Sequence, residues 1–312
     1  MSNFALHQPV LLNESLMALS VKPEGIYVDA TFGRGGHSRE ILKQLNHQGH
    51  LYCFDQDLEA INYGNQHFKA SNMTLIHSSF GHLATVLEDK QLTGRVNGIF
   101  MDLGVSSPQL DDAHRGFSFQ KAGPLDMRMN ATCGQTAAQW LNQVEEDKLA
   151  YIIKEYGEER YARKIAKKII ETRIERAIDD TQILSELICS VIKKREPGKH
   201  PATRTFQAIR IYINQELNVL ETALNQALEC LSPKGRLAVI SFHSLEDRIV
   251  KRFMRDKCQG NVPLGLPVRD NEIIREVKWV VKKQTPHKDE IEANPRSRSA
   301  ILRVIEKNEC NG

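Results

Sequence analysis

The sequence lacks the features of membrane, secreted and zinc-binding proteins. No stretch approaches the roughly 20 consecutive apolar residues of a membrane span, and the N-terminus, with Asn3, His7 and Gln8, lacks the basic-then-apolar layout of a signal peptide. The six cysteines are scattered without a Cys-x-x-Cys pair, which argues against a zinc site and against a disulfide framework. These absences predict a cytoplasmic protein with reduced thiols and no metal.

The chain also has little excess charge of either sign. Its formal net charge of +3 is too small to indicate a polyanionic partner, so the distribution of basic residues has to decide that question. With 312 residues, 41% of them hydrophobic, the chain is long enough for one large α/β unit that carries an insertion.

The first strong pattern is a glycine-rich loop between two ordered segments. A short apolar run ends in Asp29, the glycines Gly33, Gly35 and Gly36 follow, and residues 41–45 resume helical spacing. Because glycine has no Cβ, this loop can adopt positive φ angles and let a ligand lie against bare backbone at the start of the helix. The segment therefore predicts the first strand, loop and helix of a nucleotide-binding α/β fold.

Acidic residues end three of the first four expected strands. Asp29, Asp55 and Asp102 each follow an apolar segment typical of a buried strand, and ligands of open α/β sheets bind at that edge. Asp55 lies 22 residues after Gly33, close to the spacing of about 20 residues at which an acid binds a ribose hydroxyl. The alternative for Asp55 is a strand-end acid that caps the next helix.

Two ligands fit such a loop: a dinucleotide and S-adenosylmethionine. A dinucleotide fingerprint requires Gly-x-Gly-x-x-Gly, whereas Ser38 holds the third glycine position here. Asp29 would sit badly beside a pyrophosphate but suits the cationic sulfonium and ammonium groups of S-adenosylmethionine. That donor, and with it a methyl transfer, is favoured. Phe80 lies just beyond the third expected strand, at 73–77. It is either placed to stack on an adenine ring or an ordinary core residue.

Helical periodicity dominates the middle of the chain. Apolar stripes recur at helical spacing from residue 136 to 194 and predict a small helical domain. Its basic run is either a solvated helix face or a phosphate contact. That run contains Arg160, Arg163, Lys164, Lys167 and Lys168.

The prolines and the glycine of residues 196–201 break the helical pattern. We interpret the following helical segment, 203–217, as the return into the first domain. The expected domains are a core at 1–110 and 201–312 and an inserted helical substrate-recognition domain at 111–200. Three further strands are expected, at 236–242, 279–281 and 300–305.

Seven motifs taken together resemble one known family. In chain order they are residues 29–38 (DATFGRGGHS), 102–111 (DLGVSSPQLD), 115–119 (RGFSF), 123–129 (GPLDMRM), 201–211 (PATRTFQAIRI), 241–248 (SFHSLEDR) and 294–299 (NPRSRS). They closely resemble the bacterial 16S ribosomal RNA cytosine-N4 methyltransferase family, also called RsmH or MraW. The resemblance implies an α/β, Rossmann-like S-adenosylmethionine-dependent methyltransferase core with an inserted helical domain, and a cytidine of 16S ribosomal RNA in the decoding region as acceptor.

Matched position by position, the resemblance implies donor contacts at seven residues. These are Gly35, Gly36, His37, Asp55, Phe80, Asp102 and Gln109. The expected acceptor, an exocyclic amine, is a poor nucleophile because its lone pair is delocalised into the ring. The enzyme must therefore hold the nitrogen in line with the methyl group and accept its protons.

Three residues are candidates for the chemistry itself. We expect Asp102 closest to the reacting centre, with the backbone carbonyls of Leu103 or Gly104, or the Ser106 hydroxyl, as hydrogen-bond acceptors. The family match instead gives Asp102 a role in donor binding. His243 either orients a base flipped out of its stack or is an ordinary histidine at a helix start. Many amino-group methyltransferases place two prolines and an aromatic residue after the acid, and these prolines are missing here.

RNA contacts are expected from six arginines in the matching loops, because RNA is gripped through its phosphates and shape. These are Arg115, Arg128, Arg204, Arg210, Arg296 and Arg298. The expected partner is 16S ribosomal RNA within the small subunit, and a homodimer is an open alternative to a monomer. Two other functions stay open: a ribosome-assembly factor that binds RNA and S-adenosylmethionine, and a methyltransferase of DNA or of a free nucleoside.

Overall fold

The computed structural model describes residues 9–193, 196, 198–260, 273 and 275–309, and the chain divides into two compact units. The first unit consists of residues 1–104 and 217–312, and the second of residues 105–216. The inserted segment thus begins at residue 105 rather than at 111, and it ends at residue 216 rather than at 200.

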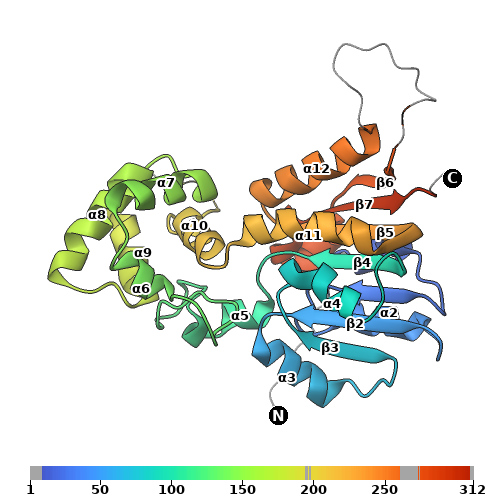
Figure 1. Ribbon diagram of the computed structural model, residues 1–312. Helices are drawn as coiled ribbons and strands as arrows, with labels where there is room; N and C mark the ends of the chain where they lie inside the picture. The colour runs from blue at the N-terminus through green and yellow to red at the C-terminus, as the bar shows by residue number, and fades with distance from the viewer. Residues whose placement is uncertain (1–8, 194–195, 197, 261–272, 274, 310–312) are drawn as a thin grey trace. The chain divides into compact units, whose positions relative to one another are not determined.

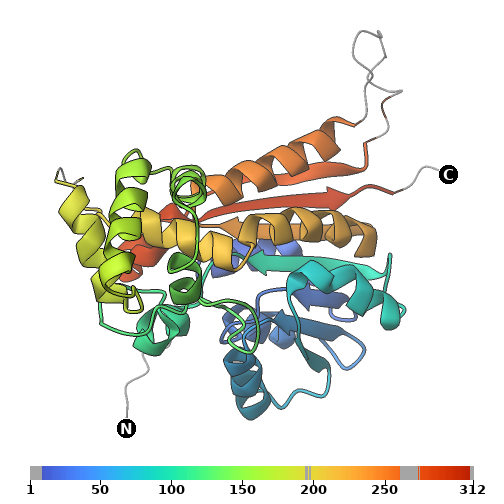
Figure 2. The same ribbon diagram turned by 60° about the vertical axis from the view of Figure 1, so that its left-hand side comes forward.

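The first unit is built on a seven-stranded sheet with the order β3-β2-β1-β4-β5-β7-β6 (Figures 1 and 2). Neighbouring strands are parallel from β3 to β5, whereas β7 is antiparallel to both β5 and β6. The strands are β1 (Ile26–Asp29), β2 (His50–Asp55), β3 (Met73–His77), β4 (Val96–Asp102), β5 (Leu231–Ser241), β6 (Val277–Gln284) and β7 (Ile301–Lys307). This sheet confirms the predicted Rossmann-like α/β class.

Helices pack on both faces of this sheet, because alternate strand residues point to opposite faces and both sets are apolar. In β4, Ile99 and Met101 pack into one buried cluster and Phe100 into the other. The α-helices of the first unit are α1 (Leu12–Leu19), α2 (Gly36–Gln44), α3 (Leu58–His67), α4 (Leu83–Asp89), α11 (Glu216–Cys230), α12 (Ser244–Gln259) and α13 (Lys288–Ala293). The sheet therefore has the double cover that a parallel sheet requires.

The second unit is a helical domain with a buried core of its own. Trp140, Leu149, Ile165 and Ile188 belong to that core, which confirms the helical periodicity of this region. Its helices are α5 (Ser107–Asp111), α6 (Ala137–Leu141), α7 (Glu146–Gly157), α8 (Ala162–Glu175), α9 (Thr181–Val191) and α10 (Thr203–Ile213). Among the described residues, no helix has the length and apolar character needed to cross a membrane.

The expectation that residues 203–217 return to the first unit is wrong. Phe206 and Ile209 of α10 are buried in the same cluster as the other helices of the second unit. The helical segment is also not continuous, because Gln215 adopts a left-handed conformation with φ of 50° and separates α10 from α11. The break at 196–201 is consequently a connection inside the helical domain.

Candidate active site

The sheet order brings three acidic strand ends to one edge. β1 lies between β2 and β4, and all three strands run in the same direction. The carboxyl ends that carry Asp29, Asp55 and Asp102 are therefore neighbours at the edge where ligands bind in open α/β sheets. β5 adds its own carboxyl end beside Asp102, which pairs with Ile240.

Asp29 is sealed beneath the glycine loop. Only 1% of its surface is exposed, its Oδ2 accepts a hydrogen bond of 2.6 Å from the Ser38 hydroxyl, and its Oδ1 accepts one of 3.1 Å from the Thr31 N–H. Burial raises the pKa of Asp29 to about 6. Asp29 therefore ties the start of α2 to β1, and a direct contact with a cationic ligand does not fit its burial.

The glycines of the loop are required by the packing of the protein itself. Gly35 has a φ of 70°, and a Cβ there would lie 2.4 Å from the Phe68 ring and 2.6 Å from the Phe32 ring. At Gly36 a Cβ would lie 2.4 Å from the Pro9 ring. Backbone freedom and close packing account for both glycines, so their contact with the donor stays a prediction.

Asp55 holds the loop from the neighbouring strand. Its Oδ2 accepts a hydrogen bond of 2.7 Å from the Gly33 N–H, and its Oδ1 accepts one of 2.8 Å from the Asp57 N–H. Burial raises the pKa of Asp55 to about 6. The helix-capping alternative is wrong, because Asp57 caps α3 by accepting the Glu59 N–H. Each carboxylate oxygen keeps a lone pair that a ribose hydroxyl can use.

His37 is a neutral, immobilised ring beside Asp102. It is 6% exposed, its ring lies 4.3 Å from that of Phe100, and Nε2 donates to the Val10 carbonyl oxygen at 3.1 Å. Burial lowers the pKa of His37 to about 4. The 3.8 Å separation between Nδ1 and Asp102 Oδ2 is consequently not a salt bridge, since the ring is uncharged near neutral pH.

Asp102 has a buried oxygen that is left without a partner. Its backbone N–H donates to Thr31 Oγ1 at 2.7 Å, but Oδ1 makes no hydrogen bond within the described part of the chain. Burial raises the pKa of Asp102 well above its usual range, and the charges of Asp29 and Glu246 add to the effect. Buried polar atoms rarely stay unsatisfied, so this edge fits a ligand that brings a hydrogen-bond donor and positive charge, as S-adenosylmethionine does.

Phe80 follows β3 and begins the short 3-10 helix Phe80–His82. Its side chain is half-buried and packs against the cluster formed with α4 and α11. The core alternative therefore accounts for part of the ring, and stacking on adenine stays a prediction for the remainder.

Ser106 and Gln109 form the N-terminal capping box of α5 in the second unit. The Ser106 side chain accepts the Gln109 N–H, and Gln109 Oε1 accepts the Ser106 N–H at 2.9 Å. The pattern Ser-x-x-Gln is the sequence signal of this box, and the sequence reasoning missed it. The box gives both residues a local structural role, so their roles toward amine and donor stay predictions.

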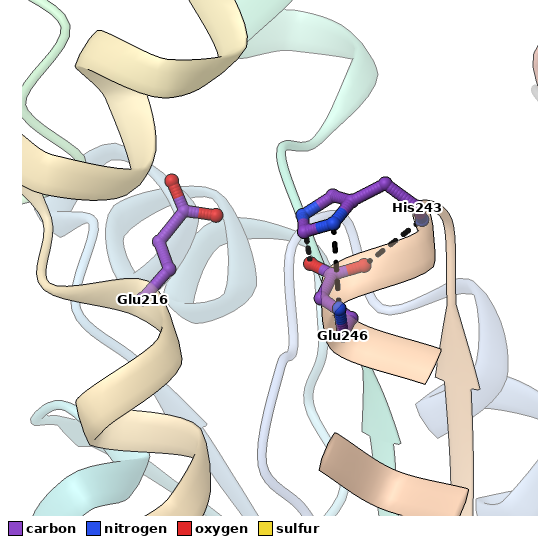
Figure 3. Close-up of side chains that lie close together, drawn as sticks. All are labelled: Glu216, His243 and Glu246. Atoms are coloured by element: carbon purple, nitrogen blue, oxygen red, sulfur yellow. Dashed lines mark hydrogen bonds and ion pairs between the residues drawn. The ribbon is translucent and has the colours of Figure 1, made fainter. Parts of the chain in front are cut away.

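His243 is the N-cap of α12 and forms a capping box with Glu246 (Figure 3). Its Nδ1 accepts a hydrogen bond of 3.4 Å from the Glu246 N–H, and Glu246 Oε2 accepts the N–H groups of Phe242 and His243 at 2.8 and 3.3 Å. The alternative of a histidine at a helix start is confirmed. His243 nevertheless keeps a buried Nε2 that has no hydrogen-bond partner in the described part of the chain.

Two of the expected RNA contacts lie in the loop that links α5 to α6. Arg115 is 7% exposed and donates to the carbonyl oxygens of Arg128 and Met129 at 3.1 and 3.0 Å. Arg128 grips both carboxylate oxygens of Asp126, at 2.8 and 2.7 Å. A direct contact of Arg115 with RNA does not fit its burial, and both arginines hold the loop.

Two further arginines form two-pronged ion pairs at the ends of α10. Arg204 donates to Glu196 at 2.8 and 3.2 Å, and Arg210 donates to Glu216, also drawn in Figure 3, at 2.9 Å with each of two nitrogens. These pairs satisfy the planar guanidinium groups inside the second unit. Their charge is therefore largely compensated before any RNA arrives.

The last two expected contacts are exposed in the first unit. Arg296 and Arg298 lie in the 3-10 helix Pro295–Ser299, whose N-cap is Asn294, and both side chains face solvent. On α8 of the second unit, the cations of residues 163–168 are exposed as well. These two surfaces retain basic groups that phosphates can reach.

The sheet, the glycine loop and the acidic edge define a Rossmann-like methyltransferase that uses S-adenosylmethionine. A model described as the MraW methylase family matches residues 4–308, and the chain belongs to this family.

Individual relatives agree with this assignment over the whole chain. The protein named ribosomal RNA small subunit methyltransferase H of Shewanella violacea is 51% identical over 310 residues, covering 98% of this chain and 99% of its own. The protein of the same name from Ruthia magnifica is 50% identical over 306 residues, with the same coverage. Among solved structures, an rRNA methylase from Streptococcus thermophilus covers 98% of this chain and 100% of its own, with 13% identity and a TM-score of 0.43.

Proposed function

We propose that this chain transfers the methyl group of S-adenosylmethionine to the N4 amino group of a cytidine in 16S ribosomal RNA. The observation that carries the chemistry is the buried Oδ1 of Asp102 at the end of β4, which has no hydrogen-bond partner in the part of the chain that the structure describes. The acceptor is supported by membership of the MraW methylase family and by relatives named ribosomal RNA small subunit methyltransferase H at about half identity.

Asp102 suits the needs of an amine acceptor. In the transfer the S–CH3 bond breaks, an N4–CH3 bond forms, and the nitrogen then releases one proton. Asp102 Oδ1 can accept a hydrogen bond from the amine, and it can take up that proton because burial and neighbouring acids raise its pKa. In this proposal Asp102 holds the nitrogen in line and receives its proton.

The donor fits the other residues of the edge. S-adenosylmethionine supplies an electrophilic methyl group on a cationic sulfur. The remaining lone pairs of Asp55 suit its ribose hydroxyls, the backbone of Gly35 and Gly36 its amino-acid end, and Phe80 its adenine. His37 and Gln109 complete the proposed donor set.

For the RNA, the proposal relies on the basic groups that stay exposed. Arg296 and Arg298 are exposed in the first unit, and the cations of α8 form a basic face on the second. In residues 163–168 the structure gives one ion pair, between Lys167 and Glu171 at 3.9 Å. We propose that the substrate-bearing partner is the small subunit or its precursor in the cytoplasm.

The test is transfer of a tritiated methyl group to small subunits from cells that lack the protein. We expect one methyl group per subunit, located on a cytidine amine by mass mapping of RNA fragments. Binding of RNA and donor without transfer would indicate an assembly factor instead, and transfer to DNA or free cytidine alone would indicate a different substrate class.

A further inference from the structure

The hydrogen bonds of His243 fix where its proton lies. The backbone N–H of Glu246 points at Nδ1, so Nδ1 must present a lone pair and cannot carry hydrogen. In the neutral ring the proton then sits on Nε2, an assignment that follows from the hydrogen-bond network. His243 is consequently a hydrogen-bond donor at Nε2.

This donor has no aligned acceptor within the described residues. Nε2 is buried, and although it lies 3.1 Å from Glu246 Oε1, a proximity drawn as a dashed line in Figure 3, this pair does not meet the geometry of a hydrogen bond. Figure 3 shows the imidazole alongside the Glu246 carboxylate, with Oε2 already engaged by backbone N–H groups. A buried donor without a partner is unfavourable, and a ligand that brings an acceptor relieves it.

The donor of His243 and the free acceptor of Asp102 belong to the same edge. Asp102 pairs with Ile240 near the end of β5, and the Leu103 N–H donates to the Ile240 carbonyl at 3.0 Å. His243 lies two residues after Ser241, the last residue of β5, and the charge of Glu246 acts on Asp102. One acceptor and one donor that have no hydrogen-bond partner among the described residues therefore lie at two adjacent strand ends.

This pair complements the amine edge of cytosine. Cytosine presents the N4 amino donor next to the ring acceptor N3, whereas uracil presents an O4 acceptor next to an N3–H donor. Asp102 Oδ1 matches the amine and His243 Nε2–H matches the ring nitrogen. A uracil would set acceptor against acceptor and donor against donor, which a buried site strongly disfavours.

We propose that His243 reads ring N3 of the target cytosine through its Nε2–H, and that Glu246 is a positioning residue, whose backbone N–H fixes this tautomer and whose carboxylate lies beside the ring. The inference rests on the proposed function, since it requires a cytosine as acceptor. It adds a specificity contact: His243 selects the base while Asp102 handles the amine.

The test combines a base analogue with two variants of the full-length protein. Small subunits are reconstituted with 3-deazacytidine at the target position, which removes the N3 acceptor and keeps the amine. His243→Asn keeps a good N-cap but has no donor at the Nε2 position, whereas His243→Gln extends an amide N–H toward it. Single-turnover rates are measured at saturating S-adenosylmethionine, with donor affinity and thermal unfolding as checks on the fold.

We expect about a tenfold loss of rate for wild type on the analogue, the typical effect of one hydrogen bond. His243→Asn should lose about tenfold on the normal subunit and nothing further on the analogue, and His243→Gln should recover part of the loss. The proposal would be overturned if His243→Asn lost a further tenfold in rate on the analogue. It would also be overturned if the wild-type rate were the same on the analogue and on the normal subunit. The comparison of wild-type rates on the two subunits does not depend on whether the variants fold.

The proposed function is checked within the same experiment. If wild type transfers no methyl group to the normal subunit, the proposed function fails rather than the contact. For Glu246, the variant Glu246→Gln keeps the capping box and the backbone N–H to Nδ1 but removes the carboxylate charge that lies 3.1 Å from Nε2. We expect its loss of rate to vanish in the His243→Asn background. An equal loss in both backgrounds would contradict the positioning role.

Discussion

The strand-end edge of the first unit and the second unit differ in how their charged side chains are paired. At the strand ends of the first unit, Asp29, Asp55 and Asp102 have raised pKa values, and the structure gives none of these three an ion pair with lysine or arginine within its described residues. In the second unit, three of the arginines each grip a carboxylate with two nitrogens. Acids without a basic partner make the edge favourable for a nearby cationic ligand, whereas paired arginines stabilise the fold of the second unit.

The largest expected effect concerns Asp102, the acid with a free oxygen. We expect Asp102→Ala to lower the single-turnover rate at saturating donor by about 100-fold or more, because a positioned proton acceptor contributes on that scale. Asp102→Asn, which keeps the shape but not the proton acceptor, is the matched control and should be nearly as slow. Equilibrium binding of S-adenosylmethionine is measured alongside. An unchanged single-turnover rate with weakened affinity for S-adenosylmethionine would show that Asp102 acts only in donor binding.

The next effect is structural and lies in the second unit. Arg210→Met leaves the Glu216 carboxylate, whose side chain is 10% exposed, without its partner, and we expect a loss of about 2 kcal/mol in the free energy of unfolding. Urea denaturation followed by circular dichroism measures it. Adding Glu216→Gln should restore part of the loss. The variant Arg298→Gln, at an exposed site, should have a free energy of unfolding within about 0.5 kcal/mol of wild type. An equal loss in this variant would show that paired and exposed arginines do not differ in their contribution to stability.

A smaller effect is the pH dependence of donor binding. The pKa values of Asp29 and Asp55 are raised to about 6, so both lose a proton as the pH rises through that value. A cationic donor prefers the ionised edge, and we expect the affinity for S-adenosylmethionine to rise about tenfold from pH 5 to pH 7 relative to uncharged S-adenosylhomocysteine. Calorimetric titration at both pH values measures the affinities for the two ligands. Parallel pH profiles for the two ligands would show that the acids do not sense the donor charge.

The same shifts predict the direction of stability without ligand. A carboxyl group whose folded pKa lies above its unfolded value near 3.8 binds more protons when folded. Stability is then greatest below the unfolded pKa, falls as the pH rises from about 4 to 6, and levels off above. Thermal unfolding across this range tests the trend for the apoprotein.

The smallest effect concerns exposed arginines. Arg298→Gln should weaken small-subunit binding a few-fold and lower the slope of log affinity against log salt by about one. Arg128→Gln, which breaks a pair with Asp126 instead, should lower stability and leave that slope nearly unchanged. If both variants changed the slope equally, paired and exposed arginines would not differ in function.

Local signals account for what the sequence revealed of the fold. Apolar runs that end in Asp29 and Asp102, with a glycine loop after the first, predict strands because period and turn chemistry act over a few residues. The sequence misplaced the end of the insertion. The proline-rich break at 196–201 looks the same whether it separates two domains or two helices of one domain.

In the candidate site, too, local signals were predictable from the sequence and tertiary contacts were not. Its edge could be read from acids at strand ends, and its family from seven motifs. The side-chain contacts were not predicted. The capping box of Ser106 and Gln109 has a sequence signal, Ser-x-x-Gln, whereas the ion pairs of Arg204 and Arg210 have no signal in the sequence. An arginine in a matching loop has the same letter whether it faces solvent or a carboxylate. Residue order alone thus fixed the strands, the glycine loop and the acids, whereas the burial that raises their pKa values and leaves Asp102 Oδ1 free arises only when distant segments pack together.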